Sequence, residues 1–162
     1  MKLCSQMTKF ADDYKKGNVG VEIFKSFFGE QNYTFSDSSC KEDYDIKFNG
    51  TTYEIKTNLQ DDGKLIIEEW YDRTQNRRGW IITSQADFIV FVSAKTKLML
   101  IYDCKALKAW YKASYDWIKL SVPLKVNKQT VGLYNDTWAS EYRRIPIDKI
   151  NGSLRPIVIG GE

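Results

Sequence analysis

Two alternating segments joined by Asn49-Gly50 constrain the fold more than any other part of the chain. They cover residues 43–48 and 51–56. Asn-Gly favours a two-residue type I′ turn, whose twist matches that of two antiparallel strands. Because side chains alternate across a strand, the apolar ones share one face and the charged ones the other. The apolar face consists of Tyr44, Ile46, Phe48, Tyr53 and Ile55. The sequence therefore predicts a β-hairpin with one core face and one charged face.

The charged face of this hairpin gathers two acids. A two-residue turn places Asp45 opposite Glu54, and like charges directly opposite each other destabilise a sheet. A divalent cation between the carboxylates would remove that conflict, since Mg²⁺ binds through one or two carboxylates, water and substrate phosphate. Lys56, on the same face, would then orient a water molecule or stabilise phosphate charge. The alternative is an ordinary solvated face, because a longer turn would shift the register.

The amino-acid composition excludes several kinds of catalytic and metal-binding site. The chain has no histidine, which excludes Ser-His-Asp and Cys-His sites and His-ligated zinc. Its three cysteines, Cys4, Cys40 and Cys104, are odd in number and widely spaced, so they predict neither a disulfide framework nor a Cys-x-x-Cys metal site. Proton transfer and metal binding must therefore come from carboxylates, lysines, tyrosines, thiols or metal-bound water.

Charge is unevenly distributed along the chain. Residues 1–72 hold 9 Lys and Arg against 14 Asp and Glu, whereas residues 73–162 hold 15 against 7. The first part is therefore acidic and the second basic. This asymmetry suits a carboxylate site that binds cations and a surface that binds an anionic partner. Chance clustering is the alternative.

The remaining pattern predicts a mixed α/β (α+β) chain that forms one domain over residues 1–162, with its core at about 10–115. No linker or repeat interrupts it. The expected helices cover residues 10–28, ending at Gly29, and 105–115; the expected further strands cover 31–35, 64–70, 88–93 and 97–102, with an edge strand at 142–147. The sequence contains no signal peptide and no membrane span, so we expect a cytoplasmic protein.

Three acidic residues and a lysine in this order carry a family resemblance. Asp45 is followed by the hairpin turn and then by Glu54-Ile55-Lys56, and Glu22 precedes them on the expected helix. Here the sequence resembles the PD-(D/E)XK nuclease superfamily, although Tyr44 replaces the proline of that pattern. Residues 65–70 and 79–91 resemble small phage-type members, so the similarity covers roughly residues 18–102.

The resemblance implies a fold, a cofactor and a set of roles. The fold would be a restriction-endonuclease-like αβββαβ core, with a central mixed sheet flanked by helices. Asp45, Glu54 and the backbone carbonyl of Ile55 would bind Mg²⁺, for which Mn²⁺ would substitute, and Lys56 would position the attacking water. Glu22 would be a further metal or catalytic residue; the alternative for Glu22 is a solvent-facing position on its helix. If the strand at 64–70 pairs beside the hairpin, Glu68 or Glu69 also faces the site; the favoured alternative is an acidic exposed edge.

A basic segment follows that strand and contains Arg73, Arg77 and Arg78. Guanidinium groups suit bidentate contacts to phosphate, and the neighbouring Trp70 and Trp80 predict stacking on unpaired bases. A solvated loop is the alternative.

These observations favour a Mg²⁺-dependent DNA endonuclease, with DNA favoured over RNA and a homodimer possible. One alternative is a catalytically inactive protein with the nuclease fold that binds or inhibits nucleic acid. Another is a structural module with a merely charged hairpin face.

Overall fold

The computed structural model describes residues 18–29, 33–35, 44–58, 60, 62–131 and 136–161. The chain is organised as two compact units: unit 1 holds residues 1–61, 86–103 and 156–162, and unit 2 holds 62–85 and 104–155. Since the sequence passes from one unit to the other more than once, no single cut separates them. The prediction of one domain over residues 1–162 stays a prediction. The first part of the predicted helix, residues 10–17, lies outside the described residues.

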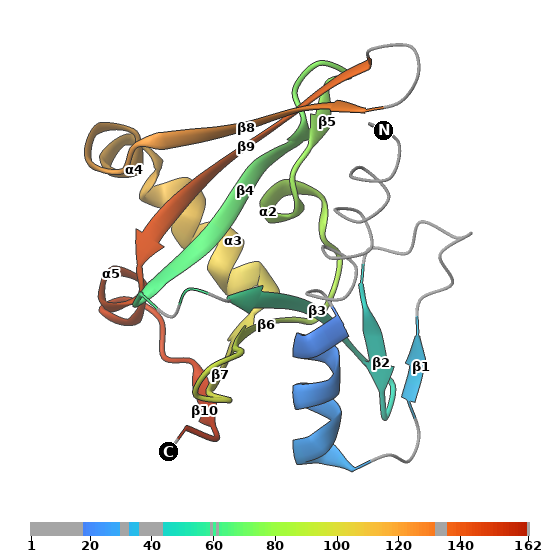
Figure 1. Cartoon of the computed structure of the whole chain (residues 1–162). Coiled ribbons are helices and arrows are strands. Elements are labelled where there is room, and N and C mark those ends of the chain that lie inside the picture. The colour runs from blue at the N-terminus through green and yellow to red at the C-terminus, as the bar shows by residue number, and fades with distance from the viewer. Residues whose placement is uncertain are drawn as a thin grey trace. The chain divides into compact units, whose positions relative to one another are not determined.

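Unit 1 is built on a six-stranded mixed sheet (Figure 1). Its strands, in spatial order, are β1 (Tyr33–Phe35), β2 (Ile46–Phe48), β3 (Thr51–Asn58), β6 (Phe88–Ser93), β7 (Met99–Asp103) and β10 (Ile157–Ile159). Only β3 and β6 pair in parallel, and the other neighbours are antiparallel. The predicted strands at 31–35, 88–93 and 97–102 are therefore confirmed to within a few residues.

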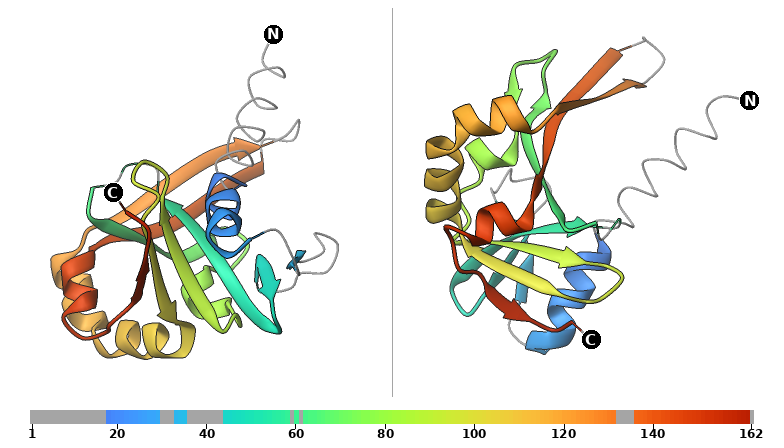
Figure 2. Two further views of the ribbon diagram at one scale, coloured as in Figure 1. Left: turned by 90° about the horizontal axis from the view of Figure 1, so that it is seen from below. Right: turned by 90° about the vertical axis from the view of Figure 1, so that its left-hand side faces the viewer.

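A helix over residues 18–28 covers one face of this sheet (Figure 2). Phe24 is fully buried and packs in the core with sheet residues from β2, β3, β6 and β7, namely Ile46, Ile55, Val90, Val92, Met99 and Ile101. The helix ends where predicted: Gly29 has φ +81°, and its N–H donates to the Lys25 carbonyl at 2.9 Å.

The hairpin is confirmed with its predicted turn and, from the turn to the pair Ile46 and Tyr53, with its predicted register. Phe48 pairs with Thr51 and Ile46 with Tyr53. Asn49 and Gly50 have φ values of 49° and 83°, as a type I′ turn requires. Ile46 and Ile55 are buried, while Phe48 and Tyr53 pack against the same core. The apolar face of the hairpin thus forms part of the core of unit 1.

Unit 2 contains a four-stranded antiparallel sheet and four short helices. In spatial order the strands are β5 (Arg77–Arg78), β4 (Lys64–Asp72), β9 (Asp136–Pro146) and β8 (Leu124–Val131). The helices are α2 (Trp80–Thr83), α3 (Cys104–Ala113), α4 (Tyr115–Ser121) and α5 (Ile147–Asn151). No helix among the described residues is long and apolar enough to cross a membrane.

One prediction about unit 2 is wrong, and one condition on the pairing of its first strand is not met. The strand expected at the edge over residues 142–147 belongs to β9, which lies between β4 and β8. Pro146 is tolerated because it is the last residue of the strand, opposite Lys64. The strand expected at 64–70 forms β4, but β4 pairs with β9 and not with β3. The parallel neighbour of β3 is instead β6, which fills the position beside it.

Candidate functional site

The carboxylate of Asp45 is bound to the backbone of the Glu-Ile-Lys segment in β3. Its Oδ2 accepts a hydrogen bond from the Ile55 N–H at 2.6 Å. Asp45 directly precedes β2, and this hydrogen bond holds its side chain at the peptide bond between Glu54 and Ile55. A hydrogen bond from an amide to a carboxylate is charge-assisted and correspondingly strong. The acid at the end of one strand and the tripeptide in the next are thus physically connected.

The predicted register at Asp45 is wrong by one position. The ladder between β2 and β3 ends at the pair Ile46 and Tyr53. Asp45 follows in a bend, and its N–H donates to the Tyr53 carbonyl at 2.9 Å. Asp45 is therefore not the ladder partner of Glu54. The shift has a physical reason, because the carboxylate gains an amide donor instead of facing a second carboxylate.

Glu54 and Lys56 lie two residues apart on the other face of β3 and form an ion pair. Their side chains are 13% and 29% exposed, respectively. In the parallel ladder Glu54 pairs with Ile89 and Lys56 with Phe91, both of which are buried. A carboxylate in such poorly hydrated surroundings attracts a cation more strongly than one in bulk water. The charged face is therefore partly shielded from solvent.

Ile55 contributes its backbone to this arrangement, since its side chain is buried in the core. In an extended strand the N–H and C=O of one residue point to the same side. The N–H of Ile55 points to Asp45, and the ladder with β2 has already ended at Tyr53. The carbonyl of Ile55 is thus directed to the same sheet edge as the Asp45 carboxylate.

Asp87, a residue that the sequence analysis did not assign to the site, fixes the start of β3 against β6. Its Oδ2 accepts hydrogen bonds from the N–H and the hydroxyl of Thr52 at 2.8 and 2.9 Å. Its own N–H donates to the Thr52 carbonyl at 3.0 Å. Thr52 precedes Glu54 by two residues on the same face, so this contact positions the strand that carries Glu54. No local pattern predicts it, because the partners are 35 residues apart.

Glu22 is not brought together with these acids. Its side chain is 68% exposed and pairs with Lys25, three residues along the helix, at 2.8 Å. Over the described residues there is no group of three or more His, Cys, Asp or Glu side chains that could hold a metal. The geometry favours the alternative for Glu22, a solvent-facing position on its helix.

The condition under which Glu68 or Glu69 would face the site is not met, because β4 pairs with β9 and not with β3. Glu69 is buried there and accepts hydrogen bonds from Arg143 Nε and from the Tyr111 hydroxyl, both at 2.5 Å. Burial, and then the hydrogen bond to Glu69, raises the pKa of Tyr111 far above its ordinary value, so the hydroxyl remains a donor at neutral pH.

The predicted basic segment concentrates two of its arginines on one aromatic ring. The guanidinium carbons of Arg73 and Arg78 lie 4.0 and 3.7 Å from the Trp70 ring centroid. Arg77, also exposed, pairs in register with Asp72 on β4. Trp70 and Trp80 are each 7% exposed, so the expectation that these tryptophans offer open faces to unpaired bases is wrong.

The charge asymmetry of the sequence follows the two units. Unit 1 has 10 Lys and Arg against 13 Asp and Glu, and unit 2 has 14 against 8. The candidate acids Asp45 and Glu54 thus lie in the unit with net charge −3, and the arginines lie in the unit with net charge +6. A basic unit attracts a polyanion over a range of about 10 Å at ordinary ionic strength.

The chain was compared with protein families, curated proteins and solved structures. No family model, no curated protein and no solved structure matches the chain.

Proposed function

We propose that this protein is a divalent-metal-dependent nuclease whose metal site consists of Asp45, Glu54 and the Ile55 carbonyl. The observation that carries the proposal is the 2.6 Å hydrogen bond from the Ile55 N–H to the Asp45 carboxylate. It joins the acid before β2 to the middle of the Glu-Ile-Lys segment in β3. In this proposal Glu54 and the Ile55 carbonyl complete a metal site beside that hydrogen bond, on a hairpin whose opposite face is core.

The donor set suits Mg²⁺ or Mn²⁺. Carboxylate and carbonyl oxygens are hard ligands, which these ions prefer, whereas thiolates and imidazoles select other metals. Mg²⁺ commonly takes only one or two carboxylates from the protein and completes its shell with water and substrate phosphate. Asp45 and Glu54 meet that requirement without a third acid, so Glu22 is not needed.

The side chains around this site have distinct roles in phosphodiester hydrolysis. A bound divalent ion would supply charge stabilisation on the phosphate and lower the pKa of an attacking water. Lys56, held beside Glu54, places an ammonium where it can orient that water or stabilise negative charge on the phosphate. Asp87 keeps β3 aligned through Thr52, so we assign it a positioning role and not a catalytic one.

The order of elements supports a restriction-endonuclease-like core. The helix over 18–28 is followed by β1, β2 and β3, and the chain then crosses over to pair β6 in parallel with β3. The helix packs on the face opposite Glu54 and Lys56. We propose that unit 1 corresponds to this core and that unit 2 consists of two insertions into it, residues 62–85 and 104–155.

DNA is the proposed substrate and unit 2 the proposed nucleic-acid-binding unit. Arg73 and Arg78 both lie against Trp70, and guanidinium groups suit bidentate contacts to phosphate oxygens; Arg73 Nε also lies 3.9 Å from the Glu141 carboxylate. A homodimer is part of the proposal in one case: if the enzyme cuts both strands of a two-fold symmetric DNA site, two copies of the protein would match that symmetry.

The test is cleavage of supercoiled plasmid, single-stranded DNA, a four-way junction and RNA, each with Mg²⁺, Mn²⁺ or EDTA. We expect at least one DNA substrate to be cut with Mg²⁺ or Mn²⁺ and none to be cut with EDTA. Cleavage that continues in EDTA would contradict the proposed metal site. Salt-sensitive binding of DNA without cleavage under any metal condition would instead identify an inactive binding protein with this fold.

A further inference from the structure

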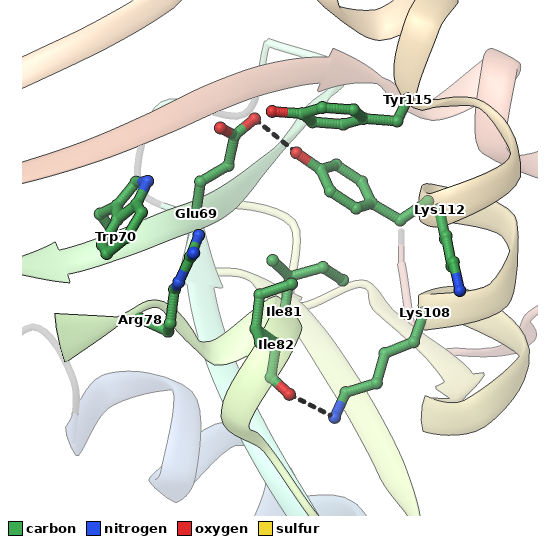
Figure 3. Close-up of a pocket in the computed structure, with 9 residues that line it drawn as sticks. Glu69, Trp70, Arg78, Ile81, Ile82, Lys108, Lys112 and Tyr115 are labelled. Atoms are coloured by element: carbon green, nitrogen blue, oxygen red, sulfur yellow. Dashed lines mark hydrogen bonds between the residues drawn. The ribbon is translucent and has the colours of Figure 1, made fainter. Parts of the chain in front are cut away.

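Unit 2 contains an open pocket of about 500 Å³, within the range of small-molecule sites (Figure 3). It lies between β4, β5, α2 and the helices α3 and α4, so all of its walls come from this unit. The residues that line it are Glu69, Trp70, Arg78, Ile81, Ile82, Lys108, Tyr111, Lys112 and Tyr115. The pocket shares Trp70 and Arg78 with the arginine pair, but none of the proposed metal ligands lines it.

Cations on two sides of the pocket suit a phosphate. Arg78 comes from β5, while Lys108 and Lys112 come from α3 on the other side (Figure 3). Lys108 is held in place because its ammonium donates to the carbonyls of Ile82, at 3.1 Å, and Ser84. Lys112 is one helical turn further on and exposed, and within the described part of the chain no carboxylate pairs with it. Lys112 is therefore the cation best placed to bind an anionic ligand.

An aromatic ring and an aliphatic side chain offer an apolar surface in the same pocket. Tyr115 is 36% exposed and Ile82 55% exposed. Tyr111 supports Tyr115, with ring centroids 5.7 Å apart. Stacking on such a ring strengthens binding and is open to every base, because each has a π-face.

Glu69 adds a hydrogen-bond acceptor. Its side chain is about nine-tenths buried, and its hydrogen bonds from Tyr111 and Arg143 both end on Oε1. Oε2 is the carboxylate oxygen left for a ligand in the pocket that Glu69 lines. A carboxylate accepts from the amino group of a base, as in the pairing of Glu with the N4 amino group of cytosine. Thymine presents a carbonyl oxygen at the corresponding position.

We infer that this pocket binds one unpaired nucleotide of a DNA strand, with an amino-bearing base toward Glu69 and its phosphate toward Lys112. The inference rests on the proposed nuclease function and adds a substrate feature to it, a nucleotide removed from the base stack. Duplex DNA would have to lose one base pair locally to fill the site. A junction, a mismatch or a single strand meets this condition at lower cost.

The probe is deoxycytidine 5′-monophosphate (dCMP), titrated by calorimetry in EDTA against deoxythymidine 5′-monophosphate (dTMP) and unphosphorylated deoxycytidine. We expect dCMP to bind at least about tenfold more tightly than either competitor, since each lacks one charge-assisted hydrogen bond. The tetranucleotide d(CCCC) should bind at least as tightly as dCMP. Weaker binding of d(CCCC) would overturn the assignment to a DNA strand.

Matched variants test the named side chains without disturbing the buried Glu69. Lys112→Ala should remove most of the advantage of dCMP over deoxycytidine, and Tyr115→Leu should weaken dCMP about tenfold. Lys149→Ala removes a lysine that is 56% exposed and does not line the pocket, so it should bind dCMP as the wild type does. Absence of dCMP binding to the wild type would overturn the inference. So would a result in which Lys112→Ala and Tyr115→Leu bind dCMP as tightly as the wild type does.

This assay separates the pocket from the nuclease. A mononucleotide contains no internucleotide bond to cleave, and EDTA removes divalent ions. Glu54→Gln should therefore bind dCMP normally even though we expect it not to cut DNA. Loss of dCMP binding in Glu54→Gln would overturn the inference that this pocket binds the nucleotide independently of Glu54.

Discussion

Glu54→Gln is expected to reduce metal-dependent cleavage by at least about 10²–10³-fold, the usual effect of losing one group that stabilises transition-state charge. Glutamine preserves the size of the side chain but removes its negative charge. It therefore weakens the proposed metal site and ends the ion pair with Lys56. The measurement is the cleavage rate of the best substrate at saturating Mg²⁺.

Two controls make this result specific. Asp148→Asn also removes one negative charge, but from a side chain that is 73% exposed and lies in unit 2, so its rate should match the wild type. Circular dichroism of Glu54→Gln should show a folded protein, because Lys56 is 29% exposed and its ammonium can be hydrated. Undiminished cleavage by folded Glu54→Gln would exclude Glu54 from catalysis.

Arg143→Met is expected to destabilise the protein by about 3–5 kcal/mol, the cost of leaving a buried charge without its partner. Arg143 and Glu69 are 6% and 8% exposed. Arg143 also donates to the Val122 carbonyl, so the substitution removes two contacts in the core of unit 2. The measurement is the free energy of unfolding in urea, followed by tryptophan fluorescence.

The neighbouring arginine is the matched control. Arg144 pairs with Asp62 at 2.7 Å, and their side chains are 23% and 34% exposed. Solvent screens such a pair, so Arg144→Met should cost no more than about 1 kcal/mol. Adding Glu69→Gln to Arg143→Met should recover most of the lost stability, since it removes the unpaired charge and keeps an acceptor for Tyr111. Equal losses for Arg143→Met and Arg144→Met would contradict this account.

The hairpin could be predicted from the sequence because its determinants are local. Asn49-Gly50 selects the turn, and alternation selects the faces. The exact position of Asp45 could not be predicted in this way. It depends on a hydrogen bond between its side chain and the Ile55 backbone, which competes with the regular ladder and shifts the residue toward Tyr53. The closeness of Asp45 to the Glu-Ile-Lys segment was thus predicted, but the hydrogen bond that joins them was not.

The sheet of unit 2 shows a second limit of sequence reasoning. An alternating pattern tells which face of β4 is buried but not which strand lies beside it. Its partner β9 is about 75 residues away in the sequence, beyond the reach of turn or spacing rules. The position of Glu69 did carry a signal, because it continues the alternation of Leu65 and Ile67, both buried. That phase places Glu69 on the buried face, where a carboxylate requires partners.

Titration of Mn²⁺ into the wild type and into Asp45→Asn, followed by electron paramagnetic resonance, tests the central claim most directly. Asparagine keeps an oxygen that can accept the Ile55 N–H, so the hairpin should fold while the metal site loses a charge. We predict saturable Mn²⁺ binding by the wild type. Asp45→Asn should bind Mn²⁺ at least about tenfold more weakly. Loss of a residue that only supports a metal ligand already weakens metal binding by about tenfold or more, and Asp45 is proposed as a direct ligand. Equal Mn²⁺ binding by the two proteins, or none by the wild type, would contradict a metal centre at Asp45 and Glu54.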